Sequence, residues 1–504
     1  MTEFLIHNMA PIIFASMVLF LLVGFPVAFA LAANGIFFGL IGIELGLLGP
    51  QLFQALPDRI FGVMSNDTLL AIPFFTFMGL ILERSGMAED LLDTIGQLFG
   101  PLRGGLAFAV IFVGALLAAT TGVVAASVIS MGLISLPIML RYGYNTKLAT
   151  GIIAASGTLA QILPPSLVLI IMADQLGKSV GDMYQGAFIP AIVLTFMYVG
   201  YVALVAIFRP DWVPALPAAA RTLHGGKLFV RALTTMVPPL MLIFLVLGTI
   251  FMGIATPTEG GAMGATGALI MALVRRRLSL ALLKQAMEST AKLTTFVIFI
   301  LVGARVFSLT FYGVDGHRWV EHLLTGLPGG EVGFLIVVNV LVFLLAFFLD
   351  FFELSFIVVP LLGPVAQALG IDLIWFGILL AVNMQTSFMH PPFGFALFFL
   401  RSVAPASVKT TDIYWGAIPF VCIQVIMVGL LIAFPQLVTF GLDKKVKVDL
   451  DTVEIDIPTS DYGGSGGYGA PAVPDALDAP KQDKPRPGAA ATDAILDMLK
   501  EQGK

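Results

Sequence analysis

The sequence has few of the residues that most catalytic and metal-binding sites use. Among 504 residues there are one cysteine, Cys422, and five histidines. The chain therefore cannot form an internal disulfide, and no Cys/His cluster has metal-ligand spacing. A GxxxxGK[ST] phosphate-binding loop is missing, which argues against direct use of ATP. No nucleophile–base pair stands out either. These absences argue against an enzyme and against a bound cofactor.

The sequence is also poor in charge. Charged residues make up 12% and hydrophobic residues 58% of the chain, whereas about a quarter of a soluble domain is charged. This composition predicts an all-α polytopic membrane protein that is surrounded by the lipid bilayer and has no nucleic-acid partner. About ten spanning helices are expected. Their predicted ranges are 8–24, 26–48, 68–84, 147–174, 184–208, 231–253, 257–275, 290–312, 373–400 and 411–436.

Two further apolar segments have the wrong length for simple spanning helices. Segment 104–141 is too long for one span of about 20 residues and too short for two. Its centre holds Thr120-Thr121-Gly122, which weaken a helix, so it is predicted to be a re-entrant helical hairpin that turns there. Segment 331–370 is predicted to form a second hairpin with its tip at 349–353. A competing topology, in which every hairpin arm crosses fully, has twelve helices.

Two of the predicted spans contain paired prolines. Pro164-Pro165 interrupts 147–174, and Pro391-Pro392 interrupts 373–400. Two prolines remove two backbone donors and clash with the preceding turn, so each helix must break. Secondary transporters build ion sites where a broken helix faces a re-entrant tip in the middle of the membrane.

The chain repeats itself across a central loop. GIIAASGTLAQILPPS (151–166) matches GILLAVNMQTSFMHPPF (377–393) with one inserted residue, and each follows a short amphipathic segment and an apolar hairpin. Because each half has five spans, the second repeat must be inverted. Chance similarity among hydrophobic segments is the alternative. The predicted organisation is a first repeat at 1–208, a connecting loop at 209–230, a second repeat at 231–442 and a tail at 443–504.

The tail differs from the rest of the chain in composition. Residues 443–504 are polar and rich in Gly, Pro and Ala. Such a segment cannot bury a core and is predicted to be disordered, apart from one short helix at 492–500. No function follows from it.

Lys and Arg are unevenly divided between the two sets of loops. One set, which includes loop 209–230, holds about fifteen, whereas the opposite set holds Arg59, Lys178 and Arg318, with the tail left aside. Cytoplasmic loops of membrane proteins carry the excess of Lys and Arg. The central loop is therefore predicted to be cytoplasmic, with the first hairpin opening from inside and the second from outside.

Oxygen-bearing residues gather at the hairpin tips and at the helix breaks. Na⁺ needs several hard oxygen ligands, and unwound backbone carbonyls supply them without a full charge. The alternative is that these hydroxyls bond only to their own backbone or to a neighbouring helix. The candidates are Thr120, Thr121, Gly122, Ser156, Gly157 and Thr158 in the first half, and Asp350, Glu353, Asn383, Gln385, Thr386 and Ser387 in the second.

Three ionisable residues stand in apolar surroundings. Asp350 and Glu353 lie at the second tip, and a charge at the bilayer centre costs about 2.5–3.5 kcal/mol on insertion scales. Either both face protein or a water-filled cavity, or the tip lies nearer the interface and both stay hydrated. His390 precedes the second proline pair. It is either a neutral, hydrogen-bonded side chain or a proton-coupling group.

Three motifs in their order resemble one transporter family. They are GTLAQILPPS (157–166), GIATPTEGGA (253–262) and LDFFELSFIVVP (349–360), followed by the second proline pair. Together they resemble the large membrane subunit of tripartite ATP-independent periplasmic (TRAP) transporters, the DctM-like permeases. The resemblance covers about 10–440. Each motif alone is weak, but their combination is specific.

The resemblance implies an inverted-repeat, elevator-type secondary transporter in the bacterial inner membrane. It implies Na⁺-coupled uptake of a small organic anion, a carboxylate with 2-oxo and hydroxy acids as candidates, delivered by a periplasmic substrate-binding protein. A small four-helix membrane subunit is a further implied partner. We expect it as a separate chain, because the first predicted span already begins at residue 8. The sequence does not name the substrate.

The resemblance also places two Na⁺ sites, each between a hairpin tip and the facing broken helix. The first tip departs from the family, because it reads Ala119-Thr120-Thr121-Gly122 where many members have Ser-Gly-Ser-Ser. Ser156 and Asn383, beside the breaks, are candidate substrate contacts. The implied Na⁺ ligands are Thr120, Thr121, Gly122, Gly157 and Thr158 in the first site, and Asp350, Gln385 and Thr386 in the second.

Two other classes of function stay open. A stand-alone Na⁺/carboxylate symporter of the same broad architecture would need neither a binding protein nor a small subunit. A channel or a membrane enzyme is the other class. Flux that saturates and stops without an ion gradient would exclude a channel.

The predicted orientation can be tested by thiol labelling. Ala215→Cys and Thr325→Cys each introduce a single thiol when Cys422→Ala is also present. An impermeant reagent in intact cells is expected to label position 325 and to spare position 215, since loop 209–230 should be cytoplasmic. Labelling of 215 with protection of 325 would show that the central loop faces outward.

Overall fold

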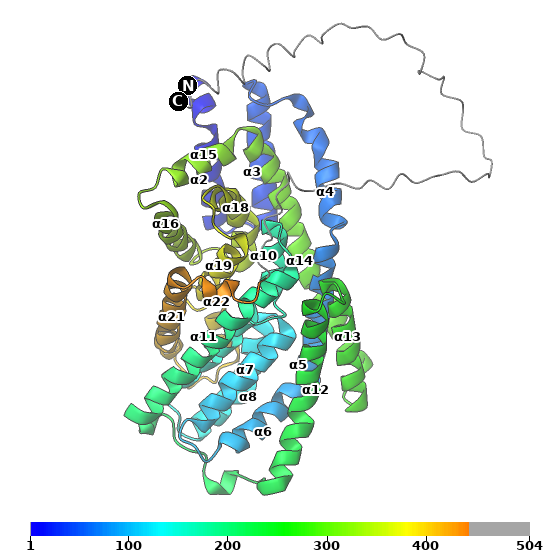
Figure 1. Ribbon diagram of the computed structural model, residues 1–504, viewed down its shortest axis with the longest axis vertical. Coiled ribbons are helices and arrows are strands. Elements are labelled where there is room, and N and C mark those ends of the chain that lie inside the picture. Colours follow the sequence, from blue (N-terminus) through cyan, green and yellow to red (C-terminus); the bar gives the residue numbers. More distant parts are fainter. Residues whose placement is uncertain (1, 443–504) are drawn as a thin grey trace, which may run out of the picture. The chain divides into compact units, whose positions relative to one another are not determined.

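The computed structural model describes residues 2–442, and these residues are mostly helical (Figure 1). No strand occurs between residues 2 and 442. The all-α prediction is therefore confirmed for this part of the chain. The disorder predicted for the tail and the short helix predicted at 492–500 lie outside the described residues.

The helices of the first half begin and end close to the predicted ranges. The segment predicted to be a hairpin is divided in two after Thr121, and the first proline-containing span is divided after Thr158. Helix α4 was not predicted, because it is short and carries Asp58 and Arg59. The helices are α1 (Thr2–His7), α2 (Met9–Leu22), α3 (Val27–Glu44), α4 (Leu56–Met64), α5 (Ala71–Arg84), α6 (Met87–Phe99), α7 (Gly105–Thr121), α8 (Val124–Arg141), α9 (Thr146–Thr158), α10 (Leu167–Leu176) and α11 (Val180–Phe208).

The second half follows the same order of elements. The predicted hairpin 331–370 is divided near Asp350, and the second proline-containing span is divided after Ser387. A short π-helix, η6 (Leu354–Val358), continues α17 into α18. The helices are α12 (Gly225–Phe251), α13 (Pro257–Val274), α14 (Leu280–Gly313), α15 (Gly316–Thr325), α16 (Gly330–Leu345), α17 (Phe351–Glu353), α18 (Val359–Ala368), α19 (Leu373–Ser387), α20 (Phe395–Val403), α21 (Thr410–Ala433) and α22 (Gln436–Thr439).

The number of spanning helices depends on how broken elements are counted. By length and composition, seven helices of the described chain could cross a membrane, or nine if two bent pairs are single spans. Two of the seven, Val124–Arg141 and Phe351–Ala368, are arms of the predicted hairpins, so length alone also permits the twelve-helix topology. The pairs α9–α10 and α19–α20 are not among these helices, because each break divides a predicted span into two helices that are too short to cross a membrane alone. The number ten stays a prediction.

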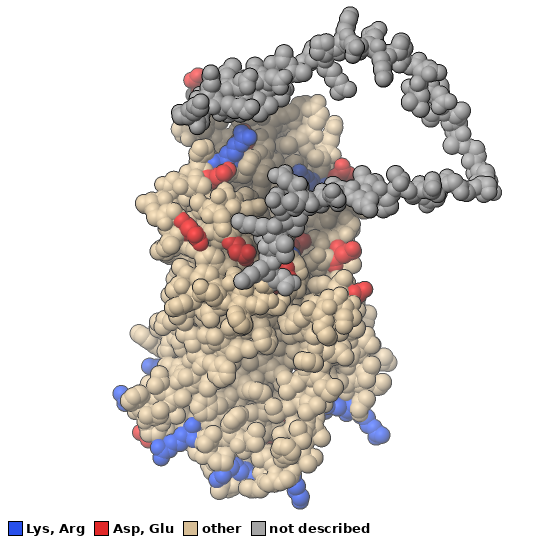
Figure 2. Space-filling view, viewed as in Figure 1, with Lys and Arg blue, Asp and Glu red and all other residues tan. Residues whose placement is uncertain are grey.

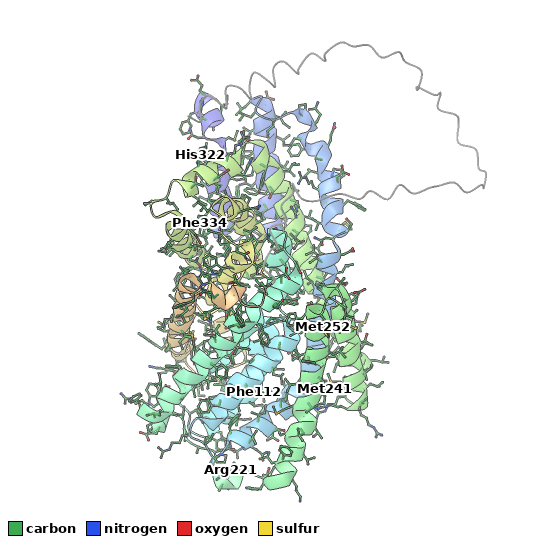
Figure 3. The ribbon with its side chains drawn as sticks, in the orientation of Figure 1. Phe112, Arg221, Met241, Met252, His322 and Phe334 are labelled. Carbon is green, nitrogen blue, oxygen red and sulfur yellow. The ribbon has the colours of Figure 1, made fainter. Side chains whose placement is uncertain are left out.

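Two groups of helices pack closely. In one group, α3 lies along α14, and α5 lies along both α13 and α14 (Figure 1). In the other, α9 is packed between α7, α8 and α21, while α19 contacts α10, α16 and α21. Outward apolar side chains such as Met241 and Met252, labelled in Figure 3, are 66% and 67% exposed. Such side chains are suited to contact lipid.

Helices α9 and α21 approach each other at two glycines. A Cβ on Gly416 would lie 2.1 Å from the Lys147 carbonyl oxygen, and one on Gly151 would lie 2.1 Å from the Gly416 carbonyl oxygen. No residue with a side chain fits at this distance. Small residues of this kind let membrane helices pack with backbones in contact.

Basic and acidic side chains gather towards opposite ends of the helices. In the view of Figure 2, most visible Lys and Arg lie at the end that carries the connection between α11 and α12. Visible Asp and Glu lie mostly towards the opposite end. This asymmetry matches the division of Lys and Arg from which the orientation was predicted.

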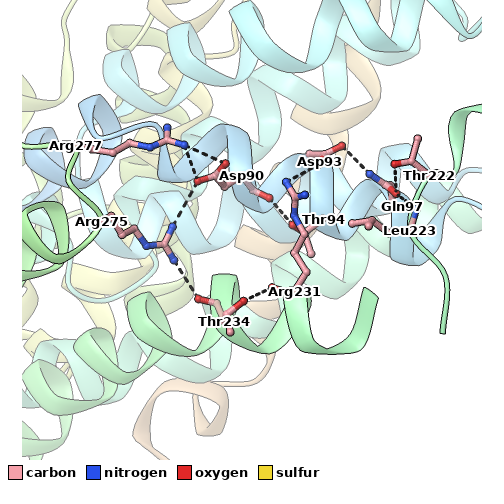
Figure 4. A network of polar contacts seen from close by, with 10 residues as sticks. All are labelled: Asp90, Asp93, Thr94, Gln97, Thr222, Leu223, Arg231, Thr234, Arg275 and Arg277. Carbon is pink, nitrogen blue, oxygen red and sulfur yellow. Dashed lines mark hydrogen bonds and ion pairs between the residues drawn. The ribbon is translucent and has the colours of Figure 1, made fainter. Parts of the chain in front are cut away.

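Helix α6 is held at this end by a polar network (Figure 4). Asp93 on α6 pairs with Arg231 on α12 at 3.1 Å. Asp90 on α6 pairs with Arg277 at 3.3 Å and with Arg275 at 3.6 Å, both just beyond α13. Since α6 also packs on α7, the network connects the first predicted hairpin with α12 and α13.

The α9–α21 contact gives a test of the fold. Gly416→Val should destabilise the protein by several kcal/mol, because overpacking of a tight contact typically costs about 1–3 kcal/mol or more. Gly429→Val on the same helix is the matched control, since a Cβ there meets nothing within 4 Å. Thermal unfolding in detergent is the measurement. Equal melting temperatures for the two variants would contradict the packing described here.

Candidate functional site

Both proline pairs interrupt their helices as predicted. Helix α9 passes into a 3-10 turn, η3 (Leu159–Gln161), and α10 begins only at Leu167. Ser166 closes this gap, because its hydroxyl donates to the Gln161 carbonyl at 2.5 Å and accepts from the Val168 N–H at 3.1 Å. In the second half, α19 ends at Ser387 and α20 starts at Phe395. The Pro164–Pro165 and Pro391–Pro392 peptide bonds are both cis.

The tip of the first hairpin faces the first break. Gly122 follows α7 with a φ of 59°, a left-handed conformation that glycine adopts without strain. A Cβ on Gly122 would lie 3.5 Å from both the Pro165 carbonyl oxygen and the Leu167 N–H nitrogen. Thr120 is buried and Thr121 is the last residue of α7. The tip and the break are therefore in contact through the backbone at Gly122.

The tip of the second hairpin is capped by its own carboxylates. Asp350 accepts from the Glu353 N–H at 3.1 Å, and Glu353 accepts from the Asp350 N–H at 3.0 Å. This reciprocal pair is a capping box, which satisfies two backbone donors at a helix start. Both residues are half-buried. A structural role for the two carboxylates is thus present, and it leaves some of their oxygen lone pairs available.

One cavity of about 260 Å³ is lined by both tips and both breaks. We call it the central cavity. The first tip contributes Gly122, and the second tip contributes Asp350. Much of the remaining wall is aromatic, which restricts water around the polar groups. The lining residues are Gly122, Val123, Val124, Ala125, Gln161, Leu167, Val168, Leu293, Asp350, Phe351, Phe352, Phe388, Phe395 and Phe399.

The two repeats are joined by a hydrogen bond between predicted ion-site residues. The Gln385 side-chain amide donates to the Thr158 hydroxyl oxygen at 3.1 Å, and both side chains are fully buried. Thr158 lies six residues before Pro164, and Gln385 lies six before Pro391. Equivalent positions of the two repeats therefore contact each other, which is the contact expected on a two-fold axis between inverted repeats.

Three buried glutamine oxygens have no hydrogen-bond partner within residues 2–442. They are the Oε1 atoms of Gln385, Gln161 and Gln424. An unsatisfied buried acceptor costs about 1–3 kcal/mol, so each is suited to accept from a cation or from water. Gln385 was predicted as a ligand, whereas Gln161 and Gln424 were not. The signal for Gln161 was a single amide inside the apolar segment before Pro164-Pro165.

The predicted hydroxyl ligands donate to carbonyls of their own helices. Thr120 donates to Leu117 at 2.9 Å, and Thr386 donates to Asn383 at 2.6 Å. Thr158 likewise donates to Ala155 at 2.9 Å. These bonds are what a purely structural role requires. A hydroxyl that donates in this way still has lone pairs, so its oxygen is able to contact a cation.

Three further predicted site residues, Ser156, Gly157 and Asn383, make contacts within the protein that a structural role explains. Ser156 donates to its own helix at Ile153, 3.1 Å away, and does not line the central cavity. Gly157 is required by packing, because its Cβ would lie 2.4 Å from the Val128 side chain on α8. Asn383 donates to the backbone and side-chain oxygens of Asn339, at 2.8 and 3.0 Å.

The structure brings only some members of the predicted second site together. Asp350 lines the central cavity, while Gln385 and Thr386 lie on α19, which contacts α17. Between residues 2 and 442, no hydrogen bond joins Asp350 to either of them. The Na⁺ ligand sets therefore stay predictions.

His390 is enclosed by aromatic rings. Its ring centroid lies 4.2 Å from that of Phe343 on α16 and 4.3 Å from that of Phe347, two residues beyond the end of α16. The side chain is 1% exposed, and neither ring nitrogen has a hydrogen-bond partner in the described part of the chain. One of the two predicted alternatives for His390 was a neutral, hydrogen-bonded side chain. The structure instead shows a side chain that packs against aromatic rings without a hydrogen bond in the described part of the chain.

Comparison with known proteins assigns the chain to a transporter family. Residues 14–437 match the family model described as "Tripartite ATP-independent periplasmic transporter, DctM component". The chain belongs to this family. The predicted resemblance to DctM-like TRAP permeases is therefore confirmed.

Known proteins of similar sequence are permeases of the same kind. The C4-dicarboxylate TRAP transporter large permease protein DctM of Pseudomonas aeruginosa is 30% identical over 390 residues, covering 77% of this chain and 89% of that protein. The ectoine TRAP transporter large permease protein TeaC of Halomonas elongata is 28% identical, covering 86% and 99%. The solved YdaH transporter of Alcanivorax borkumensis shares the fold, with a TM-score of 0.53 and 17% identity over 78% of this chain and 89% of that one.

Family membership establishes several predictions at a coarse level. The chain is a multi-pass permease of the bacterial inner membrane that takes part in substrate uptake. A TRAP large permease implies a small membrane subunit and a periplasmic binding protein as partners. The relatives are named as permeases, which argues against an enzyme.

The bond between the repeats gives a quantitative test. Thr158→Val should lower the free energy of unfolding in Na⁺-free micelles, because it leaves the buried Gln385 amide N–H without its acceptor. Gln385→Leu removes the same bond, while the Thr158 hydroxyl keeps its bond to the Ala155 carbonyl. The double variant should cost less than the sum by about 1 kcal/mol, the coupling expected of one hydrogen bond. Thr290→Val paired with Gln385→Leu is the control. The Thr290 hydroxyl has no hydrogen-bond partner in the described chain, so these two effects should add. Additive effects for Thr158 and Gln385 would show that the bond contributes nothing.

Proposed function

We propose that this permease couples the inward movement of Na⁺ to uptake of a small organic anion delivered by a periplasmic substrate-binding protein. The anion is a carboxylate, with 2-oxo and hydroxy acids as candidates. A small four-helix membrane subunit completes the transporter. In the proposed elevator mechanism, the two hairpins and the two proline-interrupted helices move together across the membrane relative to the remaining helices.

The observation that supports this proposal most is the composition of the central cavity. Both tips and both breaks contribute to a single wall, and the Thr158–Gln385 bond lies between the same broken helices. Oxygen donors at two inverted breaks give two places for a cation near one organic ligand. The unpaired Oε1 atoms of Gln161 and Gln385 are neutral acceptors of the kind that Na⁺ uses.

The charge of the substrate sets the number of ions required. Each negative charge that enters against an inside-negative membrane potential costs about 2.3 kcal/mol per 100 mV. Two Na⁺ would compensate a monoanion and leave one net positive charge moving inward, whereas a dianion would require three. The two inverted breaks suit the case of a monoanion with two Na⁺. Transport would then be electrogenic.

Reconstitution in liposomes tests the coupling. We expect uptake only when the chain, its small subunit, the binding protein and external Na⁺ are all present. Uptake should rise when a K⁺ diffusion potential makes the interior negative, because net positive charge enters. The substrate is chosen by thermal-shift screening of the binding protein against 2-oxo, hydroxy and dicarboxylic acids.

Three outcomes would contradict the proposal. Robust uptake by this chain alone would indicate a stand-alone symporter, and flux that does not saturate would indicate a channel. Equal uptake with external Na⁺ and with external choline would remove Na⁺ coupling while leaving the family assignment intact.

A second experiment tests the ion ligands. Thr386→Val should raise the Na⁺ concentration for half-maximal uptake by about tenfold, since loss of one ligand worth ~1.4 kcal/mol has this effect. Thr195→Val on α11 is a matched control. Its hydroxyl also donates to its own helix, at 2.8 Å from the Ala191 carbonyl, but it lies outside the predicted sites. An equal response of both variants would mean that the Thr386 hydroxyl only bonds to its backbone.

A further inference from the structure

A second cavity of about 410 Å³ lies beside helix α14. Its wall includes Arg305, Ser308 and Tyr312 of α14, Arg59 of α4, Gln175 of α10 and Phe356 of η6. We call it the arginine cavity. A volume of this size is in the range that holds small organic molecules.

The arginine cavity carries positive charge and no acidic side chain in its lining. Arg305 is half-buried in a long apolar helix, where a charge is costly and usually functional. Neither Arg305 nor Arg59 forms an ion pair within residues 2–442. A guanidinium without a partner is suited to bind a carboxylate or a sulfonate through two parallel hydrogen bonds.

Neighbouring polar groups leave this charge uncompensated. Asp174, which precedes the lining residue Gln175, accepts from Asn66 at 2.6 Å and from Gln175 at 2.7 Å. The Tyr312 hydroxyl donates to the Pro360 carbonyl at 3.3 Å. The arginine cavity therefore has two cationic side chains whose charge no lining residue neutralises.

The arginine cavity adjoins the central cavity. Phe352 lines the central cavity and Phe356 lines the arginine cavity. Their rings are stacked with centroids 6.4 Å apart. Gln175 and Arg59 lie near the set of loops that is poor in Lys and Arg, which the positive-inside rule assigns to the outer face.

We propose that the arginine cavity binds the acidic group of the transported organic anion on the outer side of the central cavity. This inference rests on the proposed uptake function. Arg305 is the principal contact because it is half-buried and lies on the same face of α14 as Ser308 and Tyr312, three and seven residues further on. The cavity would concentrate anions released by the binding protein before they reach the central cavity.

Charge-selective labelling tests the proposal without transport. Ser308→Cys in a Cys422→Ala background is reacted with sulfonatoethyl and trimethylammonioethyl methanethiosulfonates, in the complex with the small subunit in phosphatidylcholine nanodiscs. The quantity measured is the ratio of the labelling rate of the anionic reagent to that of the cationic reagent. Arg305 should raise this ratio, so Arg305→Gln should lower it by about tenfold. Arg305→Lys should retain the ratio. Arg318→Gln is the control, since Arg318 pairs with Asp315 at 3.6 Å outside the cavity.

Protection experiments identify the bound anion. Pyruvate, succinate and isethionate serve as probes, and at least one should slow labelling of the thiol at position 308 when Arg305 is present and not after Arg305→Gln. A parallel set uses nanodiscs that contain phosphatidylglycerol. Protection by phosphatidylglycerol and by none of the organic acids would overturn the proposal in favour of a lipid headgroup site.

Uptake measurements separate this proposal from the proposed function. In liposomes, Arg305→Gln should raise the KM for the anion about tenfold and leave the half-saturating Na⁺ concentration unchanged. Na⁺-driven uptake by the unaltered complex with no effect of Arg305→Gln on labelling or KM would reject the arginine cavity alone. A changed labelling ratio without any uptake would support anion binding there and reject the proposed function.

Discussion

The structure depends on one constraint, which is that the backbone groups left unpaired by two successive prolines must find partners. In apolar surroundings an unpaired backbone group costs several kcal/mol, so a broken helix is tolerated only where other protein groups or a cavity receive its ends. At the first break, the Ser166 hydroxyl donates a hydrogen bond to the Gln161 carbonyl. Gly122 allows the hairpin tip to lie against Pro165 and Leu167. At the second tip, Asp350 and Glu353 pair the free N–H groups of a helix start. The central cavity forms where these two arrangements meet.

The contact between Thr158 and Gln385 makes the two halves depend on each other. Each residue occupies the same distance before its proline pair, so one hydrogen bond connects equivalent points of both repeats. A ligand at this position would contact both repeats at once. The two tips differ in chemistry, because the first offers neutral hydroxyl and backbone oxygens, whereas the second offers a carboxylate. The relatives named for dicarboxylate and ectoine transport show that one architecture serves chemically different substrates.

The sequence predicts those parts of the site that have a strong local signal. Paired prolines and the Thr-Thr-Gly tip mark the interruptions after Thr158, Ser387 and Thr121, and the structure has them there. Gln161 and Gln424 were missed because a single amide in an apolar run has no spacing pattern that points to a site. Arg305 was missed for a different reason: it lies inside a spanning segment, and the count of Lys and Arg that predicts orientation uses loops. The Thr158–Gln385 bond depends on how two inverted halves pack, which no window of the sequence contains.

The ion pairs of α6 have a consequence for any movement of the first hairpin. Helix α6 leads through residues 100–104 into α7, while Asp90 and Asp93 hold it to arginines on and beyond α12 and α13. Displacement of α7 and α8 relative to α13 therefore requires either that residues 100–104 bend or that these ion pairs separate. Their side chains are partly exposed to solvent, between 22% and 49%, so each pair contributes about 1 kcal/mol or less. Because salt screens such pairs, the ionic strength on this side of the membrane would set how firmly the first hairpin is restrained at rest.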